Sequence, residues 1–168
     1  MEHAHAEFLD EKLKNDQFGF ACLHYSVSEA SGHISILVLN KKAEAGSVRV
    51  QTQDAEATAG EDYEAVDKLI EFKKGEKEHV FDIKINDDED WEPDENFFIH
   101  LLDPKTAAKL EGQDTTCKVT IIDDDKPGQV GFEETNTVTA NANEEFVEIV
   151  LVRKNGSDGT ITVDFETI

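Results

Sequence analysis

Short segments in which apolar and polar residues alternate constrain the fold of this chain more than any other feature. The stretch SVRVQTQ (47–53) alternates Val48 and Val50 with polar residues, and HVFDIKIN (79–86) and TCKVTII (116–122) follow the same pattern. Side chains of a β-strand point alternately to the two faces of a sheet. This period of two therefore predicts strands that bury one face.

Four further segments complete the predicted set of strands. ISILVL (34–39) and NFFIHLL (96–102) are more continuously apolar, and the others are FGFACLHYSV (18–27) and KLIEF (68–72). Turn residues such as Gly, Ser and Lys separate the segments. Seven short strands in about 110 residues predict an all-β fold, an immunoglobulin-like antiparallel β-sandwich. The one helix-like stretch, PKTAAKLEG (104–112), is expected to form at most a short turn.

The charge of the chain narrows the range of functions. Its 168 residues include 38 Asp and Glu against 16 Lys and Arg, which gives a formal net charge of −22. Nucleic acid and anionic membrane surfaces repel such a chain, whereas cations are attracted to it. No stretch reaches the roughly 18 apolar residues that cross a bilayer, and the N-terminus lacks the apolar core of a signal peptide.

The two cysteines are too few for a disulfide framework. Cys22 and Cys117 are expected to be free thiols in a reducing compartment. The alternative is a single bridge, if the first and last strands of the domain lie side by side.

An internal repeat divides the chain. Residues 20–55 resemble residues 132–168, since each copy opens with Phe and continues through two strands, a Lys/Gly turn and an alternating third strand. The offset of about 112 residues matches the length of one domain. Residues 1–16 are expected to be a linker or a cloning remnant, and residues 17–126 the complete domain. Residues 127–168 are then a linker with a truncated second domain, or a segment that another chain completes.

Acidic residues gather in the connections that follow alternate strands. INDDEDWEPDENFF (85–98) places seven carboxylates in the nine positions from Asp87 to Glu95. If each connection reverses direction, the first, third, fifth and seventh strands all end at the same pole of the sandwich. Acids follow each of these ends: Glu29, then Asp54, Glu61 and Asp62, then the run from Asp87, and then Asp123, Asp124 and Asp125.

A pole of carboxylates without interleaved His or Cys suits a hard cation. Ca²⁺ takes about six to eight oxygen ligands at ~2.3–2.6 Å and tolerates irregular geometry, whereas Mg²⁺ keeps several waters. Zn²⁺ prefers His or Cys. The number of acids predicts more than one Ca²⁺ ion, with shared carboxylates. An EF-hand is excluded, because Pro93 stands where a loop counted from Asp88 needs Gly.

Three segments resemble the signature of Calx-β domains, the calcium-binding regulatory domains of sodium/calcium exchangers. These segments are INDDEDWEPDENFFIHL, AGEDYE and VTIIDDD. The resemblance covers residues 18–126 fully and residues 130–168 as the start of a second Calx-β domain. In the exchangers, two such domains stand in tandem in the large cytoplasmic loop between transmembrane segments. The first of them is the high-affinity sensor and clusters several Ca²⁺ ions.

This resemblance implies a set of calcium ligands. The family's ligand positions fall on Glu29, Asp62, Asp87, Asp88, Glu92, Glu95, Asp123, Asp124 and Asp125. Asp90 is a tenth candidate, at a position where the exchangers offer a backbone carbonyl. The Lys126–Gly128 sequence departs from the usual short linker. The second copy has TANAN where the first has SEASG, which predicts a weaker or empty site there.

The resemblance also implies partners and a location. The partners are Ca²⁺, a second Calx-β domain and the transmembrane transport domain of the same exchanger, with neither nucleic acid nor membrane insertion of this fragment. The expected location is the cytoplasmic loop of a plasma-membrane transporter.

Two functions compete, and the first is favoured by the absence of a signal peptide, the scarcity of Cys and the tandem copy joined by a very short linker. In the first, a sensor, Ca²⁺ relieves the repulsion of the empty pole and stiffens the Asp125–Gly128 junction. In the second, the domain is a structural or adhesive module in which Ca²⁺ is a permanent brace. Affinity separates the two, because sensors bind at about 10⁻⁷–10⁻⁵ M and extracellular modules at about 10⁻⁴–10⁻³ M.

An enzyme is not expected. No pocket-forming insertion accompanies the paired carboxylates, and the sequence shows neither a Gly-rich phosphate loop nor a nucleophile motif. His24, His33, His79 and His100 lie on predicted strands, where we expect facing residues rather than catalytic bases.

Overall fold

The computed structural model describes residues 16–133 and 137–168, so that almost all of the expected N-terminal linker lies outside the described residues. Contacts among the described residues divide the chain into two compact units. The first unit contains the described residues up to Asp87 together with Pro93–Ile122, and the second contains Asp88–Glu92 and Asp123–Ile168.

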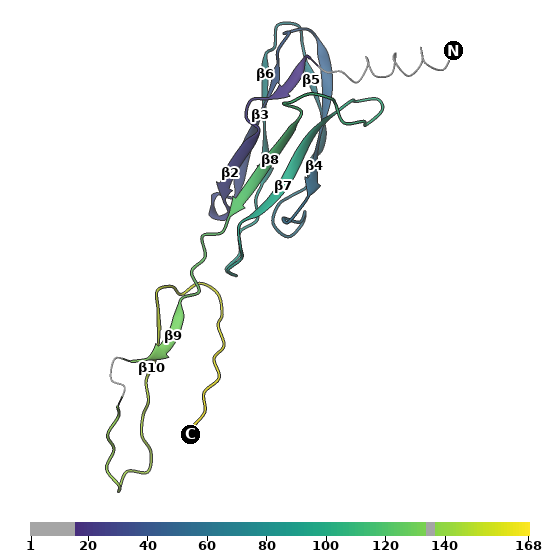
Figure 1. Cartoon of the computed structure of the whole chain (residues 1–168). Coiled ribbons are helices and arrows are strands. Elements are labelled where there is room, and N and C mark those ends of the chain that lie inside the picture. Colours follow the sequence, from purple (N-terminus) through teal and green to yellow (C-terminus); the bar gives the residue numbers. More distant parts are fainter. Residues whose placement is uncertain (1–15, 134–136) are drawn as a thin grey trace. The chain divides into compact units, whose positions relative to one another are not determined.

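The first unit is a sandwich of two β-sheets (Figure 1). The strand order is β1-β3-β6 in the three-stranded sheet and β2-β8-β7-β4-β5 in the five-stranded sheet. The strands are β1 Phe18–Phe20, β2 His24–Ser28, β3 His33–Asn40, β4 Gly46–Asp54, β5 Asp67–Phe72, β6 Glu78–Lys84, β7 Glu95–Leu102 and β8 Thr116–Ile122. Each of the seven predicted strands is present, which confirms the predicted all-β sandwich.

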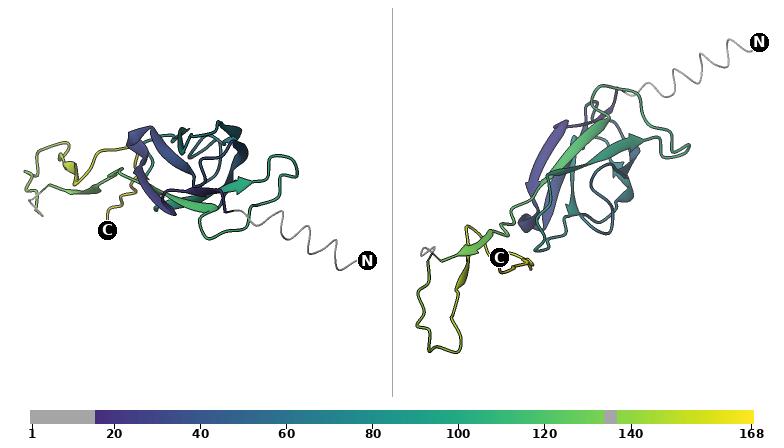
Figure 2. Two further views of the ribbon diagram at one scale, coloured as in Figure 1. Left: turned by 90° about the horizontal axis from the view of Figure 1, so that it is seen from above. Right: turned by 60° about the horizontal axis from the view of Figure 1, so that its bottom comes forward.

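The predicted first strand is divided between the two sheets. Its first part, β1, pairs antiparallel with β3, where Phe20 lies opposite Val38. Its second part, β2, pairs with β8 in parallel, where His24 lies opposite Lys118. The right view of Figure 2 shows β8 (green) beside β2 (purple). One continuous segment, residues 18–28, therefore supplies an edge strand to each of the two sheets. Among the described strands of this unit, β2 and β8 are the one parallel pair.

The alternating residues fill the core as predicted. Val48 and Val50 of β4 are fully buried, as are Cys117 and Val119 of β8. Burying a side chain of this size contributes about 1.5–3 kcal/mol. The packing therefore depends on the period of two that the sequence shows.

Both cysteines are free thiols, although the first and last strands are neighbours. Cys117 is buried and Cys22 is exposed. Burial raises the pKa of the Cys117 thiol to about 12, which keeps it protonated and unreactive at neutral pH.

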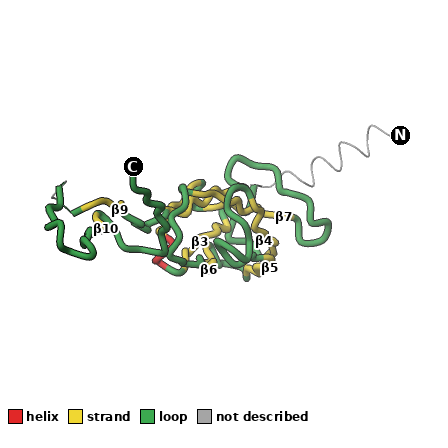
Figure 3. Tube along the Cα trace, turned by 90° about the horizontal axis from the view of Figure 1, so that it is seen from below, coloured by secondary structure: helices red, strands yellow, loops and turns green. Residues whose placement is uncertain are grey.

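The connections between the strands are mostly irregular. The helix-like stretch after β7 forms only a turn at residues 104–106, as expected. A helical turn, η1 (Glu29–Ser31), follows β2 directly, and Figure 3 shows it in red among the strands in yellow.

The second unit contains a hairpin of two short strands. β9 (Gln129–Phe132) pairs antiparallel with β10 (Leu151–Lys154). The alternating third strand expected at the end of the second copy is not formed among the described residues, which show no strand after β10. A strand requires a neighbour to hydrogen-bond, and β9 and β10 pair only with each other.

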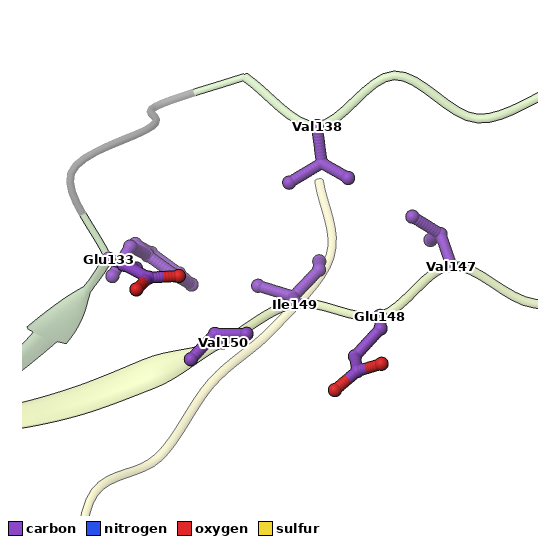
Figure 4. A pocket seen from close by; sticks show the side chains of 7 residues that line it. Glu133, Val138, Val147, Glu148, Ile149 and Val150 are labelled. Atoms are coloured by element: carbon purple, nitrogen blue, oxygen red, sulfur yellow. The ribbon is translucent and has the colours of Figure 1, made fainter.

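Apolar side chains of this unit remain exposed. A pocket beside the hairpin is lined by Val138, Val147, Ile149 and Val150, and Figure 4 shows Glu148 beside these side chains. All four apolar residues are exposed. The described residues of the second unit thus form no closed core like that of the first unit.

Candidate metal centre

Several strands of the first unit bring acidic residues to the same end of the sandwich. Parallel pairing of β2 with β8 places Ser28 beside Ile122, at the point where both strands end. Antiparallel pairing places Glu95, the first residue of β7, beside Ile121. The last residue of β4, Asp54, pairs with β7 near its start. The expected convergence of the first, third and seventh strand ends is therefore observed.

The loop after β6 reaches this end through backbone hydrogen bonds. The Ile85 N–H donates to the Gly32 carbonyl at 3.0 Å, and the Asn86 N–H donates to the Asp62 carbonyl at 2.9 Å. These bonds tie the start of the acidic run to the turn after β2 and to the loop after β4. The fifth predicted strand therefore joins the same end.

Two pairs of predicted ligands meet within the first unit. A carboxylate oxygen of Glu29 lies within 4.8 Å of one of Asp87, and the same holds for Asp62 and Glu95. Two like charges about 4 Å apart repel by about 1 kcal/mol in water and by about 4 kcal/mol near a protein surface. A bound cation would turn this repulsion into attraction.

Another acid at this end, Asp54, accepts hydrogen bonds that stabilise the fold. Oδ1 of Asp54 accepts a hydrogen bond from the Tyr63 hydroxyl at 2.5 Å and one from the Ala59 N–H at 3.1 Å. Burial raises the pKa of Tyr63, so its hydroxyl stays a donor. The predicted ligand Asp62 is oriented by its own loop, since its Oδ2 accepts the Thr58 N–H at 2.6 Å.

The other six predicted ligands belong to the second unit, where backbone donors orient several of them. The carboxylate of Asp123 accepts the N–H of Glu92 at 2.6 Å and the N–H of Asp125 at 2.6 Å. Oxygens of Asp123 and Asp125 also lie within 4.8 Å of each other. The Asp88 carboxylate accepts the Asp90 N–H at 2.8 Å. Among the described residues, neither Asp88 nor Asp90 belongs to one of the close carboxylate groups.

Burial and the crowding of carboxylates raise the pKa of Asp125. Its Oδ2 is buried and accepts no hydrogen bond from the described residues. Burial raises the pKa of Asp125, and the negative charges of Asp123, Asp158, Asp124 and Asp88 raise it further. A buried carboxylate oxygen without a donor is costly unless a cation or proton neutralises it. This set of oxygen ligands fits Ca²⁺.

Asp158 is a neighbour that the sequence analysis did not include. It follows β10 in the second copy of the repeat, and its Oδ2 accepts the Lys126 N–H at 2.9 Å. Sequence spacing assigns it to another domain, so no local pattern connects it with the acids after β8. In the first copy the corresponding turn, KKAEAG, lies away from the acidic strand ends, so the repeat gives no signal for Asp158.

A β-sandwich with carboxylates gathered beyond its strand ends defines an immunoglobulin-like module suited to bind cations. The family model of the Calx-beta domain matches residues 12–125 and again residues 123–168. The chain belongs to the Calx-beta family.

Curated relatives of the chain are sodium/calcium exchangers. It is 29% identical over 163 residues to sodium/calcium exchanger 1 of Felis catus, which covers 86% of this chain and 17% of that protein. It is 32% identical over 146 residues to the sodium/calcium exchanger Calx of Drosophila melanogaster, covering 86% of this chain and 15% of that protein. The chain thus spans less than a fifth of the length of these relatives.

Solved structures show the same relationship. The apo-form Calx CBD1 domain is 34% identical, with a TM-score of 0.58, and the match covers 64% of this chain and 96% of that one. CBD12 from CALX1.2 is also 34% identical, with a TM-score of 0.60, over 70% of this chain and 49% of that one. The chain therefore contains a CBD1-like Calx-beta domain. In the part of the chain that the structure describes, no helix has the length and apolar character to cross a bilayer.

Proposed function

We propose that this chain is the calcium-binding regulatory sensor of a sodium/calcium exchanger. Membership of the Calx-beta family and the similarity to exchangers support a calcium-binding regulatory domain. The observation that carries the proposal is the buried Asp125 oxygen, which accepts no hydrogen bond from the described residues and lies among further carboxylates. The proposed role is binding rather than catalysis, which membership of a family of regulatory domains supports.

More than one Ca²⁺ ion is proposed to bind. The first unit supplies two close pairs, Glu29 with Asp87 and Asp62 with Glu95. The proposed ligands are the ten acids of the sequence analysis: Glu29, Asp62, Asp87, Asp88, Asp90, Glu92, Glu95, Asp123, Asp124 and Asp125. Bound Ca²⁺ supplies positive charge that these carboxylates share.

The proposed sensing depends on the electrostatic repulsion within the site when no cation is bound. Without a cation, the acids at the strand ends repel one another, and this repulsion opposes the ordering of the loops. The chain prepares the site by fixing Asp123 through two backbone donors and Asp62 through the Thr58 N–H. Neutralising the acids stabilises the loops and stiffens the Asp125–Gly128 junction. The bistable element that Ca²⁺ biases is thus the junction itself.

The domains that we propose respond to this change belong to the same exchanger. They are a second Calx-β domain and the transmembrane transport domain, with this chain in a cytoplasmic loop at the plasma membrane. The tandem CBD12 structures support a second Calx-β domain as the immediate partner.

An affinity measurement tests the proposal. We expect competition with a calcium indicator of known affinity to give a Kd of about 10⁻⁵ M or below, the range of sensors. A Kd of about 10⁻⁴–10⁻³ M would instead identify a permanent brace of the structural or adhesive type.

A further inference from the structure

Arg153 on β10 lies at the centre of the hydrogen bonds that hold the junction. Its Nε donates to the Pro127 carbonyl at 2.6 Å. Its two terminal nitrogens donate to the Gly159 carbonyl at 3.1 Å and to the Asp158 carbonyl at 2.5 Å. The planar guanidinium presents five donors in a fixed fork, so one side chain can fix three carbonyls at once. Arg153 thereby joins the junction to the turn after β10.

A reciprocal pair of bonds joins the same two segments. The Lys126 N–H donates to Oδ2 of Asp158 at 2.9 Å, and the Asp158 N–H donates to the Lys126 carbonyl at 3.2 Å. The two segments are therefore held in one register, at the residue that directly follows the acidic triplet Asp123–Asp125.

The two backbones approach so closely that only glycine fits. A Cβ on Gly156 would lie 1.9 Å from the Lys126 carbonyl oxygen. A Cβ on Gly128, which has a φ of +73°, would lie 2.5 Å from the Gly156 carbonyl oxygen. Real Cβ atoms do not approach backbone atoms this closely, so these glycines are required by the contact.

The turn after β10 also packs against the acidic loop Asp88–Glu92. A Cβ on Gly159 would lie 2.4 Å from the Glu89 carbonyl oxygen. The loop belongs by its contacts to the second unit, together with Asp123–Ile168. One turn thus lies against both segments of this unit that carry proposed ligands.

We propose that Arg153 is a positioning residue for the calcium site, holding Lys126–Gly128 against the turn 156–159 and thereby orienting Asp123–Asp125. This inference rests on the proposed function. The triplet follows β8 directly, and Arg153 fixes the chain at its other end. Carboxylates oriented before an ion arrives lose less conformational freedom on binding, so affinity rises.

Replacing Arg153 by Lys tests this role, because the charge is kept while the three-way fork is lost. We expect Arg153→Lys to raise the Kd for Ca²⁺ about tenfold or more, as removal of a group that orients metal ligands commonly does. If Arg153 acted only through its charge, Arg153→Lys would leave the Kd for Ca²⁺ unchanged. Arg153→Gln would then bind Ca²⁺ more tightly, because a nearby positive charge is lost. Positioning predicts weaker binding for both variants.

The matched control is Arg49→Lys. Arg49 also uses a guanidinium fork, but it pairs with Asp67 between β4 and β5 at 2.6 Å. We expect this variant to bind Ca²⁺ like the parent. Gly156→Ala is a second test without a change of charge, since the added methyl must push the Lys126 carbonyl away. We expect it to weaken Ca²⁺ binding as Arg153→Lys does.

A readout without calcium tests whether Arg153 orders the junction. In chelator, the Lys126 amide should exchange its hydrogen faster in Arg153→Lys than in the parent, and an equal rate would contradict the positioning role. If the parent binds Ca²⁺ and the variants Arg153→Lys and Gly156→Ala bind it with an unchanged Kd, the positioning role is wrong and the proposed function stands. If the parent binds no Ca²⁺, the proposed function fails and the positioning role fails with it, whatever the exchange of Lys126 shows.

Discussion

Ser28 and Ile122 are paired in parallel at the ends of β2 and β8. Because the two strands run in the same direction, the chain leaves both of them at the same end of the sandwich. Glu29 and Asp123 are the next residues along the chain. The one parallel pair among the described strands of this unit therefore directs two of the acidic segments to one end.

Removing a proposed ligand should weaken calcium binding. We expect Asp124→Ala and Glu92→Ala each to raise the Kd for Ca²⁺ tenfold or more, which corresponds to about 1.4 kcal/mol or above. Each change removes a carboxylate that would share an ion. Calorimetric titration of each variant measures the effect.

Glu44→Ala is the matched control for these two variants. Glu44 lies in the turn between β3 and β4, away from the strand ends that carry the acids. This variant loses the same charge and should keep the parent Kd. If Asp124→Ala, Glu92→Ala and Glu44→Ala all bound Ca²⁺ with the Kd of the parent, the acids would form only a solvated acidic surface.

Calcium should stabilise the folded chain. A ligand that binds only the folded state adds RT ln(1 + [L]/Kd), about 2.7 kcal/mol per site at a hundredfold excess over Kd. Thermal melts in chelator and in Ca²⁺ measure the difference, and the melting temperature should rise with Ca²⁺. Coincident melts would show that binding and folding are not coupled.

The fold was predictable because its signal is local. Val48 and Val50 already show the alternation that buries them, and the turn at residues 104–106 was expected. The division of the first strand between two sheets was not predictable, since the sequence shows no turn signal between β1 and β2. Its break depends on which neighbour each half pairs with, and pairing is a tertiary property.

The candidate site was predictable only in part. The convergence of Glu29, Asp62 and Asp87 followed from strand direction, which alternation and turns supply. The contributions of Arg153 and Asp158 did not, because they act through backbone carbonyls and amides of the junction. Hydrogen bonds between segments far apart in sequence leave no pattern in either segment.

His100 should make stability depend on pH. Its Nδ1 lies 3.0 Å from the Thr116 hydroxyl, and its Nε2 lies 3.0 Å from Nζ of Lys109. Burial lowers the pKa of His100, and the charge of Lys109 lowers it further. The unfolded chain then binds a proton more readily than the folded chain, so this contribution to stability is present above about pH 6.5 and is lost as pH falls below it.

Urea unfolding in chelator between pH 7.5 and pH 5.5 measures this effect. We expect the free energy of unfolding to fall less on acidification in His100→Gln than in the parent. His79→Gln is the control, because His79 is exposed. An identical pH dependence in the parent and in His100→Gln would contradict this role.

Tyr63 should stabilise the end of the sandwich that carries the acids. Its ring stacks on Phe97 with centroids 3.9 Å apart, and its hydroxyl donates to Asp54. Tyr63→Phe keeps the ring and removes the donor, so the free energy of unfolding should fall by about 1–3 kcal/mol. Chemical denaturation measures the loss, and an unchanged midpoint would show that the hydrogen bond contributes nothing.

The measurement that tests the central claim most directly is a calorimetric titration of the chelator-treated chain with Ca²⁺, repeated with Mg²⁺. The account predicts more than one Ca²⁺ per chain, at least one of them with a Kd of about 10⁻⁵ M or tighter, and poor competition by Mg²⁺. A single site of about 10⁻³ M affinity, or an equal response to Mg²⁺, would contradict it.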